Sequence, residues 1–165
     1  MTTRVEPMAR GQAERLMGLL EEMLSDQGLG WGDLDGIGVG IGPGNFTGIR
    51  ISVAAARGLA LGLGRPAIGV SRLEALALGA PRPCLAAVEA PRGQAYVQRF
   101  DGGAVELRAS RPDDALPPLT AEEEIARIAR IAASRLGTDQ PRPAPLYVRA
   151  ADAAPASDPP PVLLP

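Results

Sequence analysis

The chain has 165 residues, which is enough for one domain or a shortened two-lobed protein. Its net charge of −2 at pH 7 provides no long-range attraction to nucleic acid. It contains no histidine, no lysine and a single cysteine. Catalysis by a Ser–His or Cys–His pair, Schiff-base chemistry and His- or Cys-built zinc sites are therefore excluded.

The start of the chain shows no apolar leader segment. The longest apolar run, Ile49 to Leu63, contains two arginines and falls short of the roughly 18 residues that span a bilayer. We therefore expect no membrane span and a cytoplasmic location. Cys84, in "PCLAAVEA", is expected to lie in a buried strand as a small hydrophobic residue.

An amphipathic helix is expected over residues 10–27, because apolar side chains recur there at helical spacing and cover an arc of roughly 160°. A strand at about 36–42 follows, with bulky aliphatic side chains on one face and only glycine on the other. The apolar side chains of the helix are Leu16, Met17, Leu19, Leu20, Met23 and Leu24, and those of the strand are Ile37, Val39 and Ile41.

The stretch "GIGVGIGPGNFTGIR", Gly36 to Arg50, resembles a phosphate-binding loop between a strand and a helix. No register fits G-x-G-x-x-G, and without lysine a Walker-type loop is not available. Asn45 or Thr47 is expected to cap the helix that follows. A structural turn that brings helix and sheet close together is favoured, and an anion held at the helix N-terminus stays as an alternative.

The helix expected at 47–63 is apolar or small nearly all round, so it should be buried on both sides. One side can cover the sheet. The other side is either covered by the helix at 10–27 or forms, together with that helix, an interface with another protein, for instance a four-helix arrangement across a dimer. We favour the interface, which would comprise Leu16, Leu20, Met23, Ile51, Ala54, Ala55, Gly58 and Gly62.

The rest of the chain predicts alternating short elements of an α/β protein. Ser71 with Glu74, and Thr120 with Glu123, form capping boxes that start two helices, the second with Ile125, Ile128, Ile131 and Leu136 inward. Four strands are expected, in "PAIGV" (66–70), "CLAAVEA", "QAYVQRF" and "AVELRAS", the last two joined as a hairpin through Asp101-Gly102-Gly103. The tail from Gln140 is rich in proline and is expected to be extended.

Residues 36–77 resemble the signature block of the TsaB family, which functions in threonylcarbamoyladenosine modification of tRNA. The resemblance rests on a strand, a G-P-G-S/N-F-T-G-x-R loop, a helix and a G-V-S-x-L-x-x-L-A turn. "AAVEAPRGQAYVQRF" and "PLYVRAADA" resemble two further family segments, the second through Pro145, Tyr147 and Arg149. The loop residues that match the family are Gly42, Pro43, Gly44, Asn45, Phe46, Thr47, Gly48 and Arg50.

The resemblance implies an actin-like, RNase H-like α/β fold with an N-terminal lobe over 1–76, a C-terminal lobe over 77–140 and a proline-rich tail over 141–165. It also implies a scaffold without catalytic residues or a metal site of its own, which dimerises with the catalytic subunit TsaD through the helices at 10–27 and 47–63. ATP and metal would be held by TsaD, TsaE would be a further partner, and tRNA would be contacted through the complex. A homodimer is a competing assembly.

The chain departs from the family pattern near its start, where members have a strand and a hairpin before the first helix. The fold is therefore expected to be incomplete at its N-terminus, and the strand at 36–42 to have one unpaired edge. A wrongly assigned start is favoured over a partner that completes the sheet.

Two other functions stay open. An acyltransferase or peptidase-like enzyme would rely on groups such as Glu89 or Asp101, and an anion- or nucleotide-binding module would use the helix start at Thr47 to Ile49. We interpret Arg82, Arg92 and Arg99 as scattered surface residues in preference to residues that contact tRNA.

Overall fold

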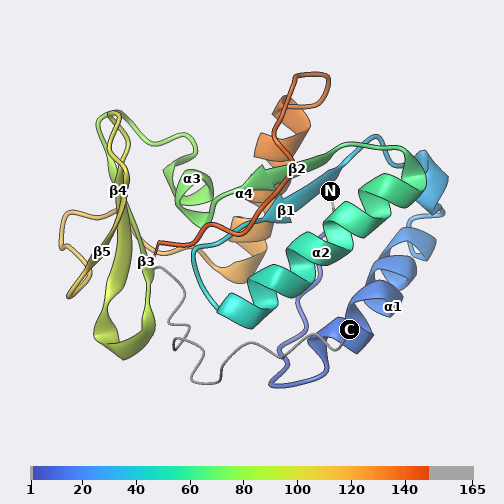
Figure 1. The fold of residues 1–165 in the computed structure, drawn as a ribbon, viewed down its shortest axis with the longest axis horizontal. Coiled ribbons are helices and arrows are strands. Elements are labelled where there is room, and N and C mark those ends of the chain that lie inside the picture. Colours follow the sequence, from blue (N-terminus) through green and yellow to red (C-terminus); the bar gives the residue numbers. More distant parts are fainter. Residues whose placement is uncertain (1, 149–165) are drawn as a thin grey trace, which may run out of the picture.

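A computed structural model describes residues 2–148 and contains two small sheets with helices packed around them (Figure 1). The elements are α1 (Gln12–Ser25), a 3-10 turn (Trp31–Asp33), β1 (Ile37–Gly40), α2 (Phe46–Leu63), β2 (Ala67–Val70), α3 (Arg72–Ala77), β3 (Leu85–Glu89), a second 3-10 turn (Pro91–Gly93), β4 (Ala95–Arg99), β5 (Val105–Arg108) and α4 (Ala121–Ser134).

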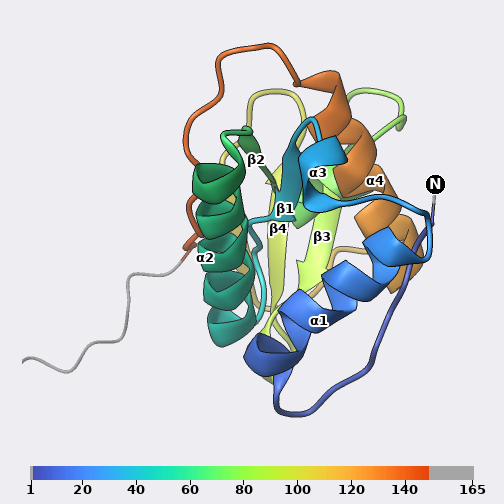
Figure 2. The same cartoon turned by 90° about the vertical axis from the view of Figure 1, so that its right-hand side faces the viewer.

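The first sheet is the parallel pair β1–β2, and it lies between two helices. Figure 2 shows β1 between α2 and α4. On the α2 side, Val39 packs against the buried Val53 and Ala56. On the α4 side β1 presents glycine, and a Cβ built on Gly38 would lie only 2.7 Å from the Cβ of Ala132. The expected glycine face therefore serves close approach of a helix to the sheet, and that helix is α4.

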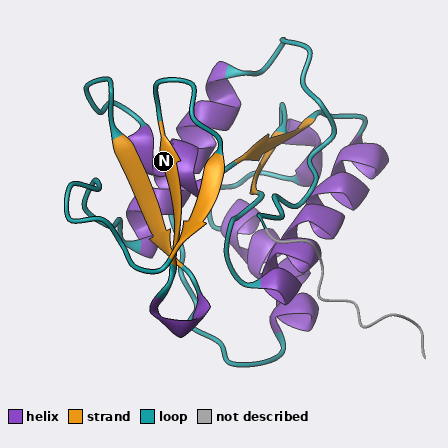
Figure 3. Ribbon diagram, turned by 60° about the vertical axis from the view of Figure 1, so that its left-hand side comes forward, coloured by secondary structure: helices purple, strands orange, loops and turns teal. Residues whose placement is uncertain are grey.

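The second sheet is antiparallel, in the order β3–β4–β5, and lies apart from the first (Figure 3). The hairpin between β4 and β5 turns at the expected Asp101-Gly102-Gly103. The short helix α3 packs on β3, with Leu73 and Leu76 in a core cluster with Ala86 and Val88.

The predictions that depend on short-range signals in the sequence are confirmed. Asn45 caps α2 by accepting a hydrogen bond from the Gly48 amide at 2.9 Å. Both predicted capping boxes form, at the starts of α3 and α4. These motifs involve residues three positions apart, so they form wherever the local backbone turns into a helix.

Two apolar side chains of α4 are more exposed than the sequence predicts. Ile128 and Ile131 are buried against β2, but Ile125 and Leu136 are 45% and 37% exposed. The prediction that all four point into the core is therefore wrong for these two, because the two-stranded sheet is too narrow to cover the whole apolar face of the helix. Although α4 falls within the expected second lobe, 77–140, it packs on the first sheet.

Two further expectations are corrected. α2 begins at Phe46, so it reaches 18 residues with a mean hydropathy of 1.3 and is long and apolar enough to cross a membrane by length and composition alone. This is weak evidence for a span, since an apolar helix of a folded domain passes the same test. Cys84 lies one residue before β3 and is half-buried rather than inside the strand.

Candidate partner-binding face and adjoining cleft

The helix α2 has one face against the sheet and one face toward solvent. Gly64, in a left-handed conformation with φ 62°, ends it. The outward face carries Ala54, Gly58 and Gly62, which are all exposed. A Cβ built on either glycine would meet no atom within 4 Å, so this face is flat and open.

A large apolar side chain that the sequence prediction missed adds to this face. Leu61 is 80% exposed, and it follows Ala54 by seven residues, which is two helical turns. Ile51 and Ala55, the other predicted interface residues of α2, are half-buried at its margin. The helical spacing could have identified Leu61, but the prediction concentrated on the small residues.

The helix α1 does not cover this face. None of its residues is buried, and the predicted interface residues Leu16, Leu20 and Met23 are half-buried. The alternative that α1 shields the outward face of α2 is therefore wrong, and both helices keep apolar surface available for another molecule.

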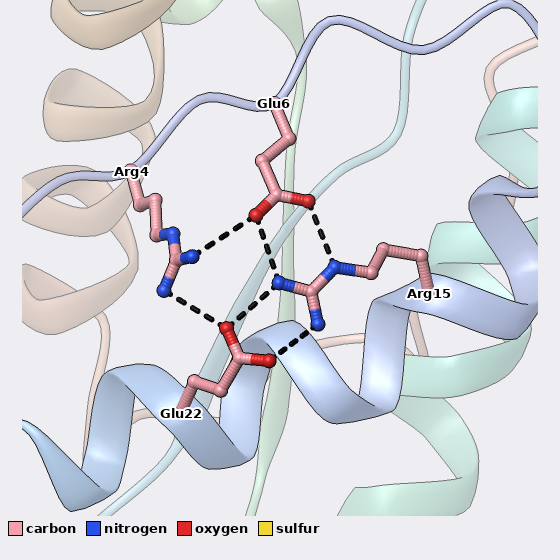
Figure 4. A network of polar contacts seen from close by, with 4 residues as sticks. All are labelled: Arg4, Glu6, Arg15 and Glu22. Atoms are coloured by element: carbon pink, nitrogen blue, oxygen red, sulfur yellow. Dashed lines mark hydrogen bonds and ion pairs between the residues drawn. The ribbon is translucent and has the colours of Figure 1, made fainter.

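Four charged side chains fix the N-terminal segment to α1 (Figure 4). Arg15 lies between Glu6 and Glu22, with Nε donating to Glu6 at 2.8 Å and Nη1 donating to Glu22 at 2.6 Å. Arg4 contacts the same two carboxylates at 3.1 and 3.0 Å. The hydrogen bond from Arg15 lowers the pKa of both Glu6 and Glu22, and the two carboxylates raise the pKa of Arg15.

The loop that precedes α2 is held in place by the start of α3. Gly42 has φ 94°, and a Cβ there would lie 2.6 Å from Ile49 Cδ1, so glycine is required by both conformation and space. The Arg72 amide donates to the Gly42 carbonyl at 2.8 Å. The Arg72 guanidinium binds both carboxylate oxygens of Glu124, at 2.8 and 3.0 Å, and so connects the loop to α4.

The loop also meets the segment near residue 147. Arg50 lies on the Phe46 ring, 3.6 Å from its centroid, and Arg50 Nε donates to the Tyr147 hydroxyl at 2.8 Å. The Leu146 amide donates to the Ile41 carbonyl at 2.8 Å. Two motif segments that are far apart in the sequence are thus brought together, while Arg149 of the second motif lies outside the described residues.

These contacts form one wall of an open cleft of about 1080 Å³ between the loop that precedes α2 and the second sheet. Its walls include Pro43, Gly44, Asn45, Arg72, Glu89, Tyr96, Glu124 and Tyr147. Arg72, the arginine among the wall residues, is already paired with Glu124, so the cleft does not favour an anion at the start of α2.

The two carboxylates considered for catalysis do not form a pair. Glu89 lies at the end of β3, where it pairs with Ala95 at the start of β4. Asp101 lies just beyond the other end of this strand pair, two residues after Arg99, which pairs with Leu85. The ends of β3 are roughly 14 Å apart, at about 3.4 Å per residue. General acid and base roles shared between these two groups are therefore not possible in this arrangement.

The architecture is that of the actin-like class of α/β proteins. The structure is similar to two structures from Pseudomonas aeruginosa, one described as an uncharacterized protein with similarity to the peptidase YeaZ and one as YeaZ itself. The first has a TM-score of 0.64 and 24% sequence identity over 87% of each chain; the second has a TM-score of 0.59 and 23% identity over 86% of each.

Sequence comparison identifies the family. The family described as "TsaD: tRNA N6-adenosine threonylcarbamoyltransferase" matches residues 6–143. The Escherichia coli tRNA threonylcarbamoyladenosine biosynthesis protein TsaB is 39% identical over 102 residues, which are 57% of this chain and 44% of that protein. The Cereibacter sphaeroides tRNA N6-adenosine threonylcarbamoyltransferase is 49% identical over 73 residues, 44% of this chain and 20% of that enzyme.

The chain therefore belongs to the threonylcarbamoyltransferase family that contains TsaD, and TsaB proteins of Escherichia coli and Haemophilus influenzae are among the relatives to which it is similar. It spans less than half the length of the curated relatives that it matches.

Proposed function

We propose that this chain is a non-catalytic activating subunit in the synthesis of threonylcarbamoyladenosine at position 37 of ANN-decoding tRNAs. It would bind the catalytic subunit TsaD through the outward face of α2, with α1 extending the contact. In this proposal TsaD holds the nucleotide, the metal and most of the tRNA, TsaE supplies the ATPase, and the assembly is cytoplasmic.

One observation carries this proposal: a helix of a family member exposes a flat row of small residues beside a large exposed leucine. Ala54, Gly58 and Gly62 lie along this face, and Leu61 projects from it. A partner helix could approach the α2 backbone closely over the glycines and bury Leu61. The names of the relatives, which include both TsaB proteins and transferases, support TsaD as the partner.

Reconstitution tests the proposal. The chain is combined with TsaD, TsaE, tRNA and threonylcarbamoyl-AMP, and the modified adenosine is measured against mixtures that lack one component. We expect product only when the chain and TsaD are both present. Product formed by the chain without TsaD would overturn the non-catalytic role.

A matched pair of substitutions tests the surface. Ala54→Glu places a charge on the outward face of α2, whereas Ala129→Glu makes the same change at an exposed position of α4. We expect the first variant to lose both TsaD binding and activation while it keeps its fold, and the second to keep both. Equal TsaD affinity of the two variants would refute α2 as the binding face.

A further inference from the structure

Arginine side chains gather around a pocket of about 360 Å³ at one end of the first sheet. The pocket lies between the C-terminal end of α2, the start of β2 and the segment that follows α4, which passes this end of α2 (Figure 2). Four arginines and one aspartate line it, an excess of three positive charges in a chain whose net charge is −2. These charged residues are Arg57, Arg65, Arg135, Asp139 and Arg142.

The fold brings these arginines together from separate elements. Arg57 belongs to α2, and Arg65 directly follows Gly64, the residue that ends this helix. Arg142 precedes Pro143, which is buried and lies against β2. The cluster is therefore a product of the tertiary structure and not a run of basic residues in the sequence.

One of the four arginines has a structural partner that accounts for it. Arg135 donates to Glu74 Oε1 at 2.5 Å and to the Gly69 carbonyl at 3.3 Å, so it joins the end of α4 to α3 and β2. The other three arginines are exposed, and none of them forms an ion pair with a carboxylate within residues 2–148. A favourable interaction with the C-terminal end of α2 accounts for Arg65 alone. Guanidinium groups stay charged, so three of them around one hollow repel one another unless an anion lies between them.

We propose that this pocket binds phosphate groups of the tRNA backbone through Arg57, Arg65 and Arg142. A guanidinium presents N–H donors side by side, and they match two oxygens of one phosphate. Contacts of this kind position a nucleic acid without reading its sequence. The family that matches the chain and the relatives similar to it are named for tRNA modification, which favours RNA over an acidic protein segment as the ligand.

The pocket adjoins the surface that we propose for TsaD. Leu61 lines the pocket and also projects from the outward face of α2. Arg57 precedes Leu61 by four residues, or about one helical turn. A TsaD molecule on α2 would therefore border the pocket, and a tRNA held by TsaD could extend onto the arginines. The inference thus rests on the proposed function and adds to it a direct tRNA contact by this chain.

The salt dependence of tRNA binding tests this contact. A triple variant removes the three arginines of the pocket that have no ion pair, and a control variant removes three exposed arginines at the second sheet. The substitutions are Arg57→Gln, Arg65→Gln and Arg142→Gln in the first variant, and Arg92→Gln, Arg99→Gln and Arg108→Gln in the control.

The tRNA affinity of each complex with TsaD is measured over a series of salt concentrations. In the triple variant the slope of log Kd against log salt should fall by about 2–3, which corresponds to binding that is roughly 100-fold weaker at about 0.1 M salt. The control should match the unmodified chain in tRNA affinity, and both variants should bind TsaD normally. Circular dichroism establishes that both are folded.

Two results of these measurements would overturn the proposal. One is equal tRNA affinity of the triple variant and the control. The other is a loss of TsaD binding in the triple variant alone, which would show that the arginines bind an acidic surface of the partner protein.

NMR of the isolated chain separates a failure of this inference from a failure of the proposed function. In about 20 mM salt, tRNA should shift the Nε–H resonances of the three arginines, and poly-glutamate at the same charge concentration should shift them less. These shifts in a chain that does not bind TsaD would refute the proposed function and leave the tRNA contact in place. Unchanged resonances, or equal shifts with poly-glutamate, would refute the contact even in a chain that binds TsaD.

Discussion

Replacing Gly58 and Gly62 by alanine should make the isolated chain more stable. Glycine inside a helix costs about 1 kcal/mol relative to alanine, because the unfolded glycine has more conformational freedom to lose. The added methyl groups meet no atom within 4 Å, so no packing penalty offsets the gain. The double substitution should therefore add about 2 kcal/mol and raise Tm by roughly 4–8 °C in a chain of 165 residues.

The same change in β1 should have the opposite sign. Gly38→Ala would place a methyl group 2.7 Å from the Cβ of Ala132, and relieving this overlap should cost about 1–3 kcal/mol. Calorimetry of both variants beside the unmodified chain checks the comparison. Equal Tm shifts for the two changes would show that the spacing around these glycines does not govern their effect.

Binding separates a structural role of the α2 glycines from a role in recognition. If TsaD packs against this face, the two methyl groups intrude on the contact and should weaken the complex by about 1–3 kcal/mol, or roughly 5- to 150-fold. The double alanine variant would then be more stable alone and bind TsaD less tightly. Unchanged affinity would mean that the partner does not approach these two positions closely.

Acid should detach the N-terminal segment from α1. Glu6 and Glu22 have a lowered pKa in the folded chain, so they stabilise the fold at pH values above their unfolded pKa of about 4.3. This stabilisation is lost as the pH falls through their folded pKa. NMR should show that the N-terminal segment is released at low pH in the unmodified chain and already at pH 7 in the Arg15→Ala variant. A segment that stays attached at low pH and in the variant would contradict the role of the ion pairs. Tyr147→Phe removes the hydrogen bond with Arg50, worth about 0.5–1.5 kcal/mol, and should speed proteolysis of the segment at 138–148. Thr120→Ala removes the cap of α4 and should lower stability by about 1 kcal/mol and Tm by roughly 2–4 °C, whereas an unchanged Tm would contradict the capping role.

The sequence was sufficient to predict the elements whose signals are local. The capping boxes at Ser71 and Thr120 and the hairpin at Asp101 each depend on residues within a few positions, and all are present. The glycine face of β1 also indicated a close helix contact, although α4 and not the following helix makes that contact. Periodicity along one element does not identify which later element will pack on it.

Contacts between segments that are far apart in the sequence could not be predicted. Arg72 pairs with Glu124 across 52 positions, and Arg50 bonds Tyr147 across 97. Arginine is abundant in this chain, so composition alone offers no way to choose these pairs. The exposure of Ile125 could not be predicted either, because helical spacing gives the direction of a side chain and not the width of the sheet beneath it.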